Sequence, residues 1–210
     1  KTTPTVKQHR GDREVFLDVS EMPKPLAWLP KSVDNSGGGQ AWVTSDKWGP
    51  FKGQLLHMSY GQSALYLVLK EMKGEQIQGG VVKFDFKRAG RTDRLTSSAM
   101  RARFNKKDGQ LYLVGLRGWQ SNAAKEGGFD RIRYTGKKTY KPVAMKSDKK
   151  GLLLTFPNKL DAELANDPTS YSLKAANIKW SQSYGSKDYK LDGSGQGWTQ
   201  MKVKYAKLQA

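Results

Sequence analysis

Hydrophobic positions from Ala41 onward fall in short runs that predict β-strands rather than helices. Every second residue is apolar from Val82 to Phe86 and again from Met100 to Phe104, which is the spacing of strands with one buried face. No convincing amphipathic helix interrupts these runs. Strands are therefore predicted in two groups, at 53–59, 64–69 and 79–86, and at 99–104, 110–116 and 129–134. This pattern predicts an all-β protein.

The two groups begin with similar sequences. Gly-Gln-Leu-Leu at 53–56 and Gly-Gln-Leu-Tyr at 109–112 each open a hydrophobic strand, about 56 residues apart. A blade of a β-propeller needs about 40 to 50 residues for its four antiparallel strands and loops. Residues 41–138 are therefore predicted to be the terminal blades of a partial β-propeller. Two blades cannot close a ring, so we expect the chain to be a fragment, with the other blades supplied from elsewhere.

The two ends of the chain differ from this middle part. Residues 1–40 are rich in proline and turn residues around one alternating stretch at 14–19, which predicts an extended segment with one strand. In 139–210, a Lys-rich connector is followed by strand candidates at 151–156 and 171–173, with a short helical or turn crossing between them, and by a last strand at 201–208. This order is typical of immunoglobulin-like β-sandwiches, which need about seven strands. We therefore predict an incomplete sandwich at 139–210.

Composition excludes several classes of site. The chain has no cysteine, so these residues hold no disulfide, no thiolate metal site and no covalent haem attached through a C-x-x-C-H motif. No apolar run approaches the roughly 18 residues that would span a membrane. Phosphate-binding glycine loops and the H-E-x-x-H motif of zinc peptidases are also absent from the sequence.

The chain is strongly basic, with 37 Lys and Arg against 19 acidic residues and a net charge of +18. Such a charge raises the question of a polyanionic partner. The basic residues are spread over predicted strand ends and turns, as at 106–107 and 137–138. This spread favours a solvated basic surface first and binding of acidic polysaccharide second, and nucleic acid least.

A longer stretch, Trp-Val-Thr-Ser-Asp-Lys-Trp-Gly-Pro-Phe-Lys-Gly-Gln-Leu-Leu-His-Met-Ser-Tyr-Gly at 42–61, resembles a segment of large secreted bacterial proteins. These are described as sugar-dehydrogenase-like, or pyrroloquinoline-quinone-dependent, β-propellers, often fused to haem-binding or cytochrome c domains. Later motifs resemble their closing blades and the start of an appended immunoglobulin-like domain. They lie at 79–82, 100–105, 108–112, 115–120, 131–136, 154–156, 160–161, 167–168 and 170–171.

The resemblance implies a periplasmic or extracellular protein. A full-length relative would oxidise a sugar with pyrroloquinoline quinone and calcium, and pass electrons to a cytochrome or haem domain outside this chain. Its partners would be the remainder of the same polypeptide or other propeller blades, and we expect the fragment alone to be inactive. The alternative is a non-catalytic extracellular scaffold or carbohydrate-binding module that engages acidic polysaccharide.

Three residues are candidates for catalysis and cofactor binding. His57 lies in a predicted strand, either as a general base or as a packed strand residue. Arg117, beside a flexible glycine, could pair with a carboxylate of a quinone or of an acidic sugar, with Trp119 next to it. The competing interpretation is a turn in which Trp119 packs between blades and Arg117 bridges loop carbonyls.

Four more residues are candidates for substrate binding. Trp48 and Tyr60 could stack on sugar rings, although aromatic residues also fill the space between blades. Arg101 and Arg103 are predicted to lie on one strand face, where they could attract anions or simply be solvated. No metal ligands are predicted, because the chain has two histidines and no D-x-D-x-D calcium loop.

Overall fold

The computed structural model describes residues 23–88, 91–92, 95–179 and 187–209. Strands make up most of its regular structure and helices little of it, which confirms the prediction of an all-β protein. The described residues divide into two compact units, a larger one of residues 24–170 and 205–209 and a smaller one that contains residues 171–204. The strand predicted at 14–19 lies outside the described residues.

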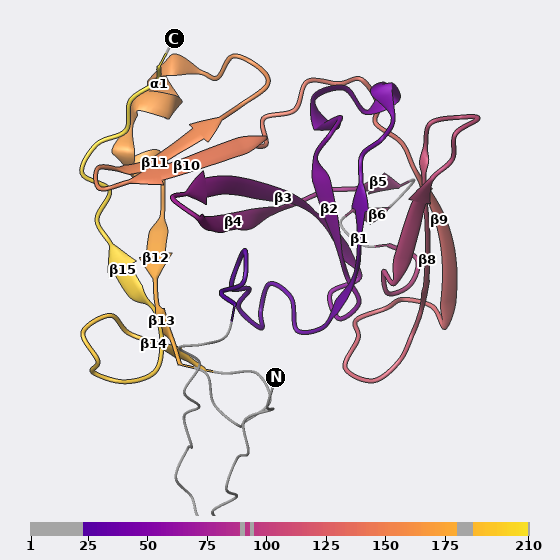
Figure 1. Ribbon diagram of the computed structural model, residues 1–210, viewed down its shortest axis with the longest axis horizontal. Coiled ribbons are helices and arrows are strands. Elements are labelled where there is room, and N and C mark those ends of the chain that lie inside the picture. The colour runs from indigo at the N-terminus through magenta and orange to yellow at the C-terminus, as the bar shows by residue number, and fades with distance from the viewer. Residues whose placement is uncertain (1–22, 89–90, 93–94, 180–186, 210) are drawn as a thin grey trace, which may run out of the picture. The chain divides into compact units, whose positions relative to one another are not determined.

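The first sheet of the larger unit is a four-stranded antiparallel meander (Figure 1). Its strands follow one another in chain order as β1 (Gly37–Trp42), β2 (Leu55–Ser59), β3 (Ala64–Lys73) and β4 (Gln76–Lys83). The first six residues of β3 are all buried, so this central strand is covered on both faces. A short 3-10 segment, η1 (Asp46–Phe51), connects β1 to β2 and begins after Ser45, whose side chain accepts a hydrogen bond from the amide of Lys47.

The second sheet is a three-stranded antiparallel meander. It consists of β7 (Arg101–Phe104), β8 (Leu111–Leu116) and β9 (Gly127–Ile132), again paired in chain order. A small ribbon of β5 (Lys87–Arg88) and β6 (Arg91–Thr92) lies between the two sheets in the sequence. The predicted strands at 99–104, 110–116 and 129–134 agree with β7, β8 and β9 to within a few residues.

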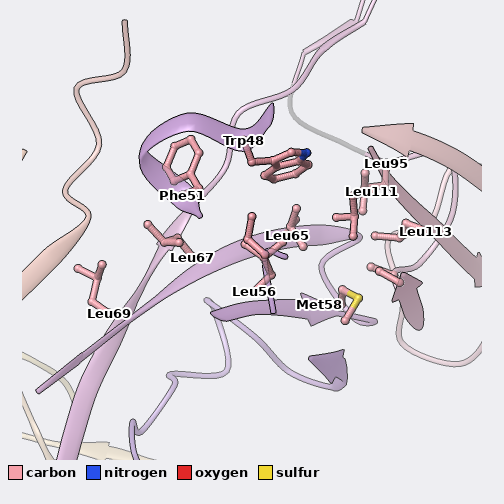
Figure 2. Packing of buried hydrophobic residues seen from close by; sticks show 13 residues of the cluster. Trp48, Phe51, Leu56, Met58, Leu65, Leu67, Leu69, Leu95, Leu111 and Leu113 are labelled. Carbon is pink, nitrogen blue, oxygen red and sulfur yellow. The ribbon is translucent and has the colours of Figure 1, made fainter. Parts of the chain in front are cut away.

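The two sheets share one hydrophobic core (Figure 2). Trp48 and Phe51 of η1 lie over leucines of the first sheet, and Trp48 meets the ring of Phe104 edge-on at 5.1 Å. Burying a leucine side chain stabilises a fold by about 1.5 to 3 kcal/mol, so this common core holds the two meanders together. Its almost fully buried members from both sheets are Leu56, Met58, Leu65, Leu67, Ala102, Leu111 and Leu113.

Glycines bring the backbone just before β7 into close contact with its neighbours. A Cβ atom on Gly115 of β8 would lie 1.3 Å from the carbonyl oxygen of Ser98, and one on Gly38 of β1 would lie 2.1 Å from that of Ala99. The prediction of a turn-rich, extended segment over 1–40 is wrong at its end, because Gly37, Gly38 and Gly39 belong to β1. Gly38 and Gly39 allow the close approach of two backbones, which a side chain would prevent.

After the second sheet, the larger unit continues with a hairpin and a short helical segment. The hairpin of β10 (Ala144–Asp148) and β11 (Gly151–Thr155) confirms the strand predicted at 151–156. It is joined to β3 by Glu71, whose carboxylate accepts hydrogen bonds from the amide and hydroxyl of Ser147. The chain then forms α1 (Ala162–Asn166), capped by the side chain of Asp161, and η2 (Pro168–Ser170).

The smaller unit contains short antiparallel pairs. Strand β12 (Leu173–Ala175) pairs with β15 (Thr199–Met201), and β13 (Asn177–Ile178) pairs with β14 (Asp188–Tyr189). The last predicted strand, 201–208, is wrong beyond Met201, because residues 202–209 form no strand. In the part of the chain that the structure describes, no helix is long and apolar enough to cross a membrane.

Candidate functional site

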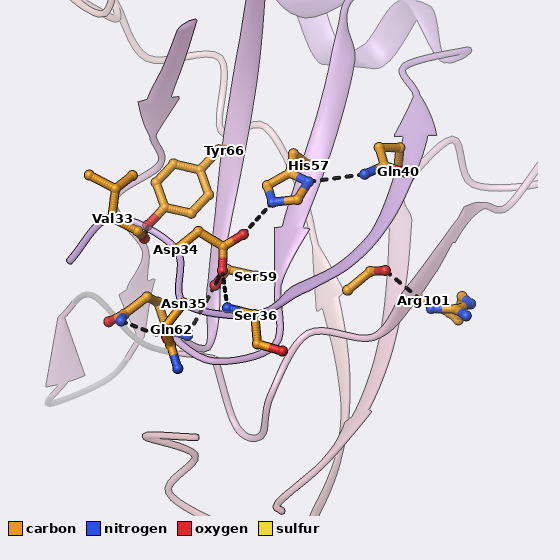
Figure 3. Close-up of polar contacts among 11 residues, drawn as sticks. Val33, Asp34, Asn35, Ser36, Gln40, His57, Ser59, Gln62, Tyr66 and Arg101 are labelled. Carbon is orange, nitrogen blue, oxygen red and sulfur yellow. Dashed lines mark hydrogen bonds and ion pairs between the residues drawn. The ribbon is translucent and has the colours of Figure 1, made fainter. Parts of the chain in front are cut away.

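A buried carboxylate, Asp34, joins the loop before β1 to strand β2 (Figure 3). Its Oδ1 accepts hydrogen bonds from the hydroxyl of Ser59 at 2.6 Å and from the amide of Ser36 at 3.0 Å. Its Oδ2 lies 2.5 Å from Nε2 of His57. The side chains of Asp34 and His57 are only 4% and 12% exposed. We call Asp34, His57 and Ser59 the Asp34 clasp.

The second ring nitrogen of His57 indicates where its proton lies. Nδ1 is 3.1 Å from the side-chain amide nitrogen of Gln40. An amide nitrogen can only donate, so with Gln40 in this orientation Nδ1 accepts and the ring carries its proton on Nε2, toward Asp34. Because amide and imidazole orientations are assigned from such contacts, this tautomer follows from the Gln40 assignment.

Electrostatics favour an ionised Asp34. Burial acts to raise the pKa of this carboxyl, but hydrogen bonds from His57, Ser59 and the amide of Ser36 outweigh it and lower the pKa below its ordinary value. The neighbouring Tyr66 donates its hydroxyl to the carbonyl of Val33 at 2.5 Å. Burial, and then the negative charge of Asp34, raise the pKa of Tyr66.

The Asp34 clasp is not a nucleophilic triad, although it contains serine, histidine and aspartate. In a triad the serine hydroxyl donates to the histidine, which in turn donates to the carboxylate. Here Ser59 donates to the same carboxylate as His57 and accepts from the amide of Gln62 at 3.0 Å. Ser59 is also fully buried. The arrangement therefore positions the imidazole and fixes a loop, without activating a hydroxyl.

Three loops meet next to the Asp34 clasp, and we call residues 33–36, 60–63 and 117–126 the loop end. The side chain of Asn35 accepts a hydrogen bond from Gln62 at 3.0 Å and donates to the carbonyl of Gln120 at 3.0 Å. The backbone N–H of Asn122 donates to the carbonyl of Gly61. Residues from distant parts of the sequence are thereby held together.

Three predicted site residues lie in the loop end. A Cβ on Gly118 would lie 2.1 Å from the hydroxyl oxygen of Tyr60, so Tyr60 contacts the loop that carries Arg117 and Trp119. The guanidinium of Arg117 is 3.4 Å from the carboxylate of Glu126, and both side chains are exposed. Trp119 is 76% exposed. His57 reaches this group indirectly, because its partner Asp34 is followed by Asn35.

Arg101 and Arg103 lie elsewhere, on the outward face of the second sheet. Arg101 pairs with Val114, which pairs with Phe129, and Arg103 pairs with Tyr112. Since side chains alternate along a strand, these residues all point away from the buried Ala102, Leu111 and Leu113. This outward surface, here called the arginine face, consists of Arg101, Arg103, Tyr112, Val114, Leu116, Phe129 and Arg131.

Trp48 lies apart from both places. It is 2% exposed and packs in the common core, so neither face of its indole is open to a sugar ring. Of the aromatic residues predicted to bind substrate, Tyr60 is therefore the one that the structure places beside accessible loops.

The loop end offers limited support for a cofactor. A quinone that bears several carboxylates needs several convergent cations, whereas the guanidinium of Arg117 is exposed and faces Glu126. Within the described ranges, no three His, Asp or Glu side chains gather in a way that could hold a metal ion. These residues alone do not fit the quinone and calcium that the resemblance implies.

Aspartate is a common turn-forming residue, and the bond from Asp34 to the amide of Ser36 closes such a turn. The bonds from Asp34 to His57 and Ser59 could not be predicted from the sequence, because these residues lie 23 and 25 positions further along the chain. An aspartate in a turn carries no sign of a distant partner.

The fold and these two sites define an all-β protein built from antiparallel meanders. Comparison with models of protein families, with curated proteins and with solved structures found no match to this chain.

Proposed function

We propose that this chain supplies two neighbouring blades of a secreted, sugar-dehydrogenase-like β-propeller. The supporting observation is the four-stranded antiparallel meander β1–β4, which shares a core with the three-stranded meander β7–β9. Propeller blades are four-stranded antiparallel sheets arranged radially, so β7–β9 would be a blade that lacks one strand. Residues 139–210, which include the hairpin β10–β11 and the short antiparallel pairs after Tyr171, would begin the immunoglobulin-like domain.

In this proposal the loop end contributes to a site that other blades complete. Arg117 would bind an anionic group of a cofactor or an acidic sugar, and Trp119 and Tyr60 would stack on a ring. Asp34 holds Nε2 of His57 and orients the imidazole, and His57 would serve as a base through Nδ1 once the side-chain amide of Gln40, which donates to Nδ1 here, has turned away.

The test is dye-linked sugar oxidation by the natural polypeptide that contains this chain, with pyrroloquinoline quinone and calcium added. We expect oxidation, and we expect Arg117→Ala to lower kcat/KM about 10- to 100-fold, the effect of losing a charge-assisted hydrogen bond. The matched control is Arg133→Ala, which removes another exposed arginine and should leave the rate unchanged. Absence of oxidation with any sugar would contradict the proposal.

The second candidate function is binding of acidic polysaccharide without catalysis. The observation that favours it is the presence of Arg101, Arg103 and Arg131 on one exposed sheet face. Retention on alginate that disappears at moderate salt, together with no sugar oxidation, would support this candidate.

A further inference from the structure

The arginine face combines charge with an unusual amount of exposed apolar surface. Phe129 is 67% exposed, Leu116 52% and Val114 43%. The rings of Tyr112 and Phe129 lie 5.5 Å apart on this face. Contiguous apolar patches on soluble proteins usually mark a surface that another molecule covers.

The charges on this face have one sign over most of its area. Arg101 donates hydrogen bonds to the backbone carbonyls of Met100 and Gly38, and Arg103 donates one to that of Ala102. A guanidinium has five N–H donors in all, so both side chains keep donors for a partner. A carboxylate occurs at one edge, where Asp108 accepts a hydrogen bond from the hydroxyl of Tyr112 at 2.6 Å. A matching cover would therefore be apolar at its centre and would carry carboxylates opposite the arginines.

The apolar side chains of the arginine face distinguish an acidic polysaccharide from a β-sheet as the partner that covers it. An acidic polysaccharide would satisfy the arginines but would leave Val114, Leu116 and Phe129 largely in water. A β-sheet would bury them, since sheets pack face to face about 10 Å apart. The inward face of this same sheet already takes part in a core of that kind with β1–β4.

The area of the arginine face indicates whether the covering sheet belongs to a separate molecule or to the same polypeptide. Three strands of four to six residues present roughly 15 Å by 20 Å, or about 300 Å². A stable complex of separate molecules buries about 800 Å² on each partner. A second copy of this chain would also place arginines against arginines. A sheet in the same polypeptide avoids both difficulties, because it needs no affinity for a separate molecule.

We propose that the arginine face is covered by the apolar face of a carboxylate-bearing β-sheet that belongs to the same polypeptide as this chain. This inference rests on the propeller arrangement of the proposed function and names the chemistry of the neighbouring sheet. It does not depend on sugar oxidation.

The test is hydroxyl-radical footprinting of the natural polypeptide that contains this chain. Phe129 and Phe51 provide a comparison between identical side chains, because they are 67% and 3% exposed here. We expect oxidation of Phe129, measured relative to the denatured protein, to fall to the level of Phe51. Tyr205, which is 64% exposed and lies outside the arginine face, serves as the reactive reference.

Three results would overturn the proposal. These are rapid oxidation of Phe129, protection that appears only after alginate is added, and protection that rises with protein concentration. The second would show a glycan site and the third self-association. If the protein oxidises a sugar but Phe129 is unprotected, this inference alone is overturned. If Phe129 is protected but no sugar is oxidised, only the proposed activity is overturned.

Charge variants test the carboxylates separately. Arg131→Glu is expected to restore oxidation of Phe129. The new carboxylate would repel the carboxylates of the covering sheet, and the sheet would no longer shield Phe129. Lys149→Glu, in the turn between β10 and β11, makes the same charge change away from the arginine face and should leave Phe129 protected. If Arg131→Glu fails to fold, Arg131→Gln is expected to give partial loss of protection. Full protection in a folded Arg131 variant would contradict the predicted carboxylates.

Discussion

Replacing Gly115 with alanine is expected to lower the free energy of unfolding of the larger unit by about 3 kcal/mol, the upper part of the usual range for overpacking. A Cβ at this position would overlap the carbonyl oxygen of Ser98 at 1.3 Å. Backbone cannot move aside as a flexible side chain can, so β8 and the segment before β7 would have to separate. Urea unfolding followed by tryptophan fluorescence measures the loss.

Gly127→Ala is the matched control for this prediction. Gly127 lies in the neighbouring strand β9, and a Cβ there would meet no atom within 4 Å. Its substitution should change the free energy of unfolding by no more than about 0.5 kcal/mol. Equal unfolding midpoints for Gly115→Ala and the unsubstituted protein would contradict this prediction, because they would show that β8 and the segment before β7 do not approach each other this closely.

Replacing Asp34 with asparagine is expected to cost about 2 to 4 kcal/mol at neutral pH. Three donors converge on this carboxylate, from His57, Ser59 and the amide of Ser36. Asparagine keeps one acceptor oxygen and turns an NH₂ group toward the remaining donors. Asp85→Asn is the control, because Asp85 is 73% exposed in its ion pair with Lys141 and such pairs contribute about 0 to 1 kcal/mol.

The effect of Asp34→Asn should depend on pH. The pKa of Asp34 is lowered in the folded protein from an ordinary value of 3.8. The ionised carboxylate therefore contributes its full stabilisation above the unfolded pKa and loses it as the pH falls through the lower, folded pKa. Unfolding curves of the two proteins should converge in acid. A constant difference down to the lowest pH at which both fold would contradict this role.

Much of the sheet structure could be predicted from the sequence, because apolar spacing reports directly which side of a strand is buried. The continuous apolar run at 64–69 is the fully buried part of β3, and the alternation around Ala102 placed Arg101 and Arg103 on one face, as the register confirms. Strand β1 was missed because a run of glycines indicates a turn unless the backbone it touches is known. That backbone lies about 60 residues away in the sequence.

The candidate site was harder to predict for a related reason. His57 and Tyr60 stood out by residue type, and Arg117 and Trp119 by a glycine-rich turn. The connection between them depends on Asp34 and Asn35, whose bonds reach β2, the 60–63 turn and the 117–126 loop. Hydrogen bonds between distant loops follow from the packing of the sheets, and residue spacing contains no record of them.

The segment that leads into β7 has a consequence for how the larger unit unfolds. Ser98 and Ala99 have no exposed surface, and glycines of β1 and β8 press on their carbonyl groups from the two different sheets. Neither meander can open to solvent without releasing this stretch from the other. The two should therefore lose structure in a single cooperative step, with the slowest-exchanging amide protons of both sheets sharing one opening free energy.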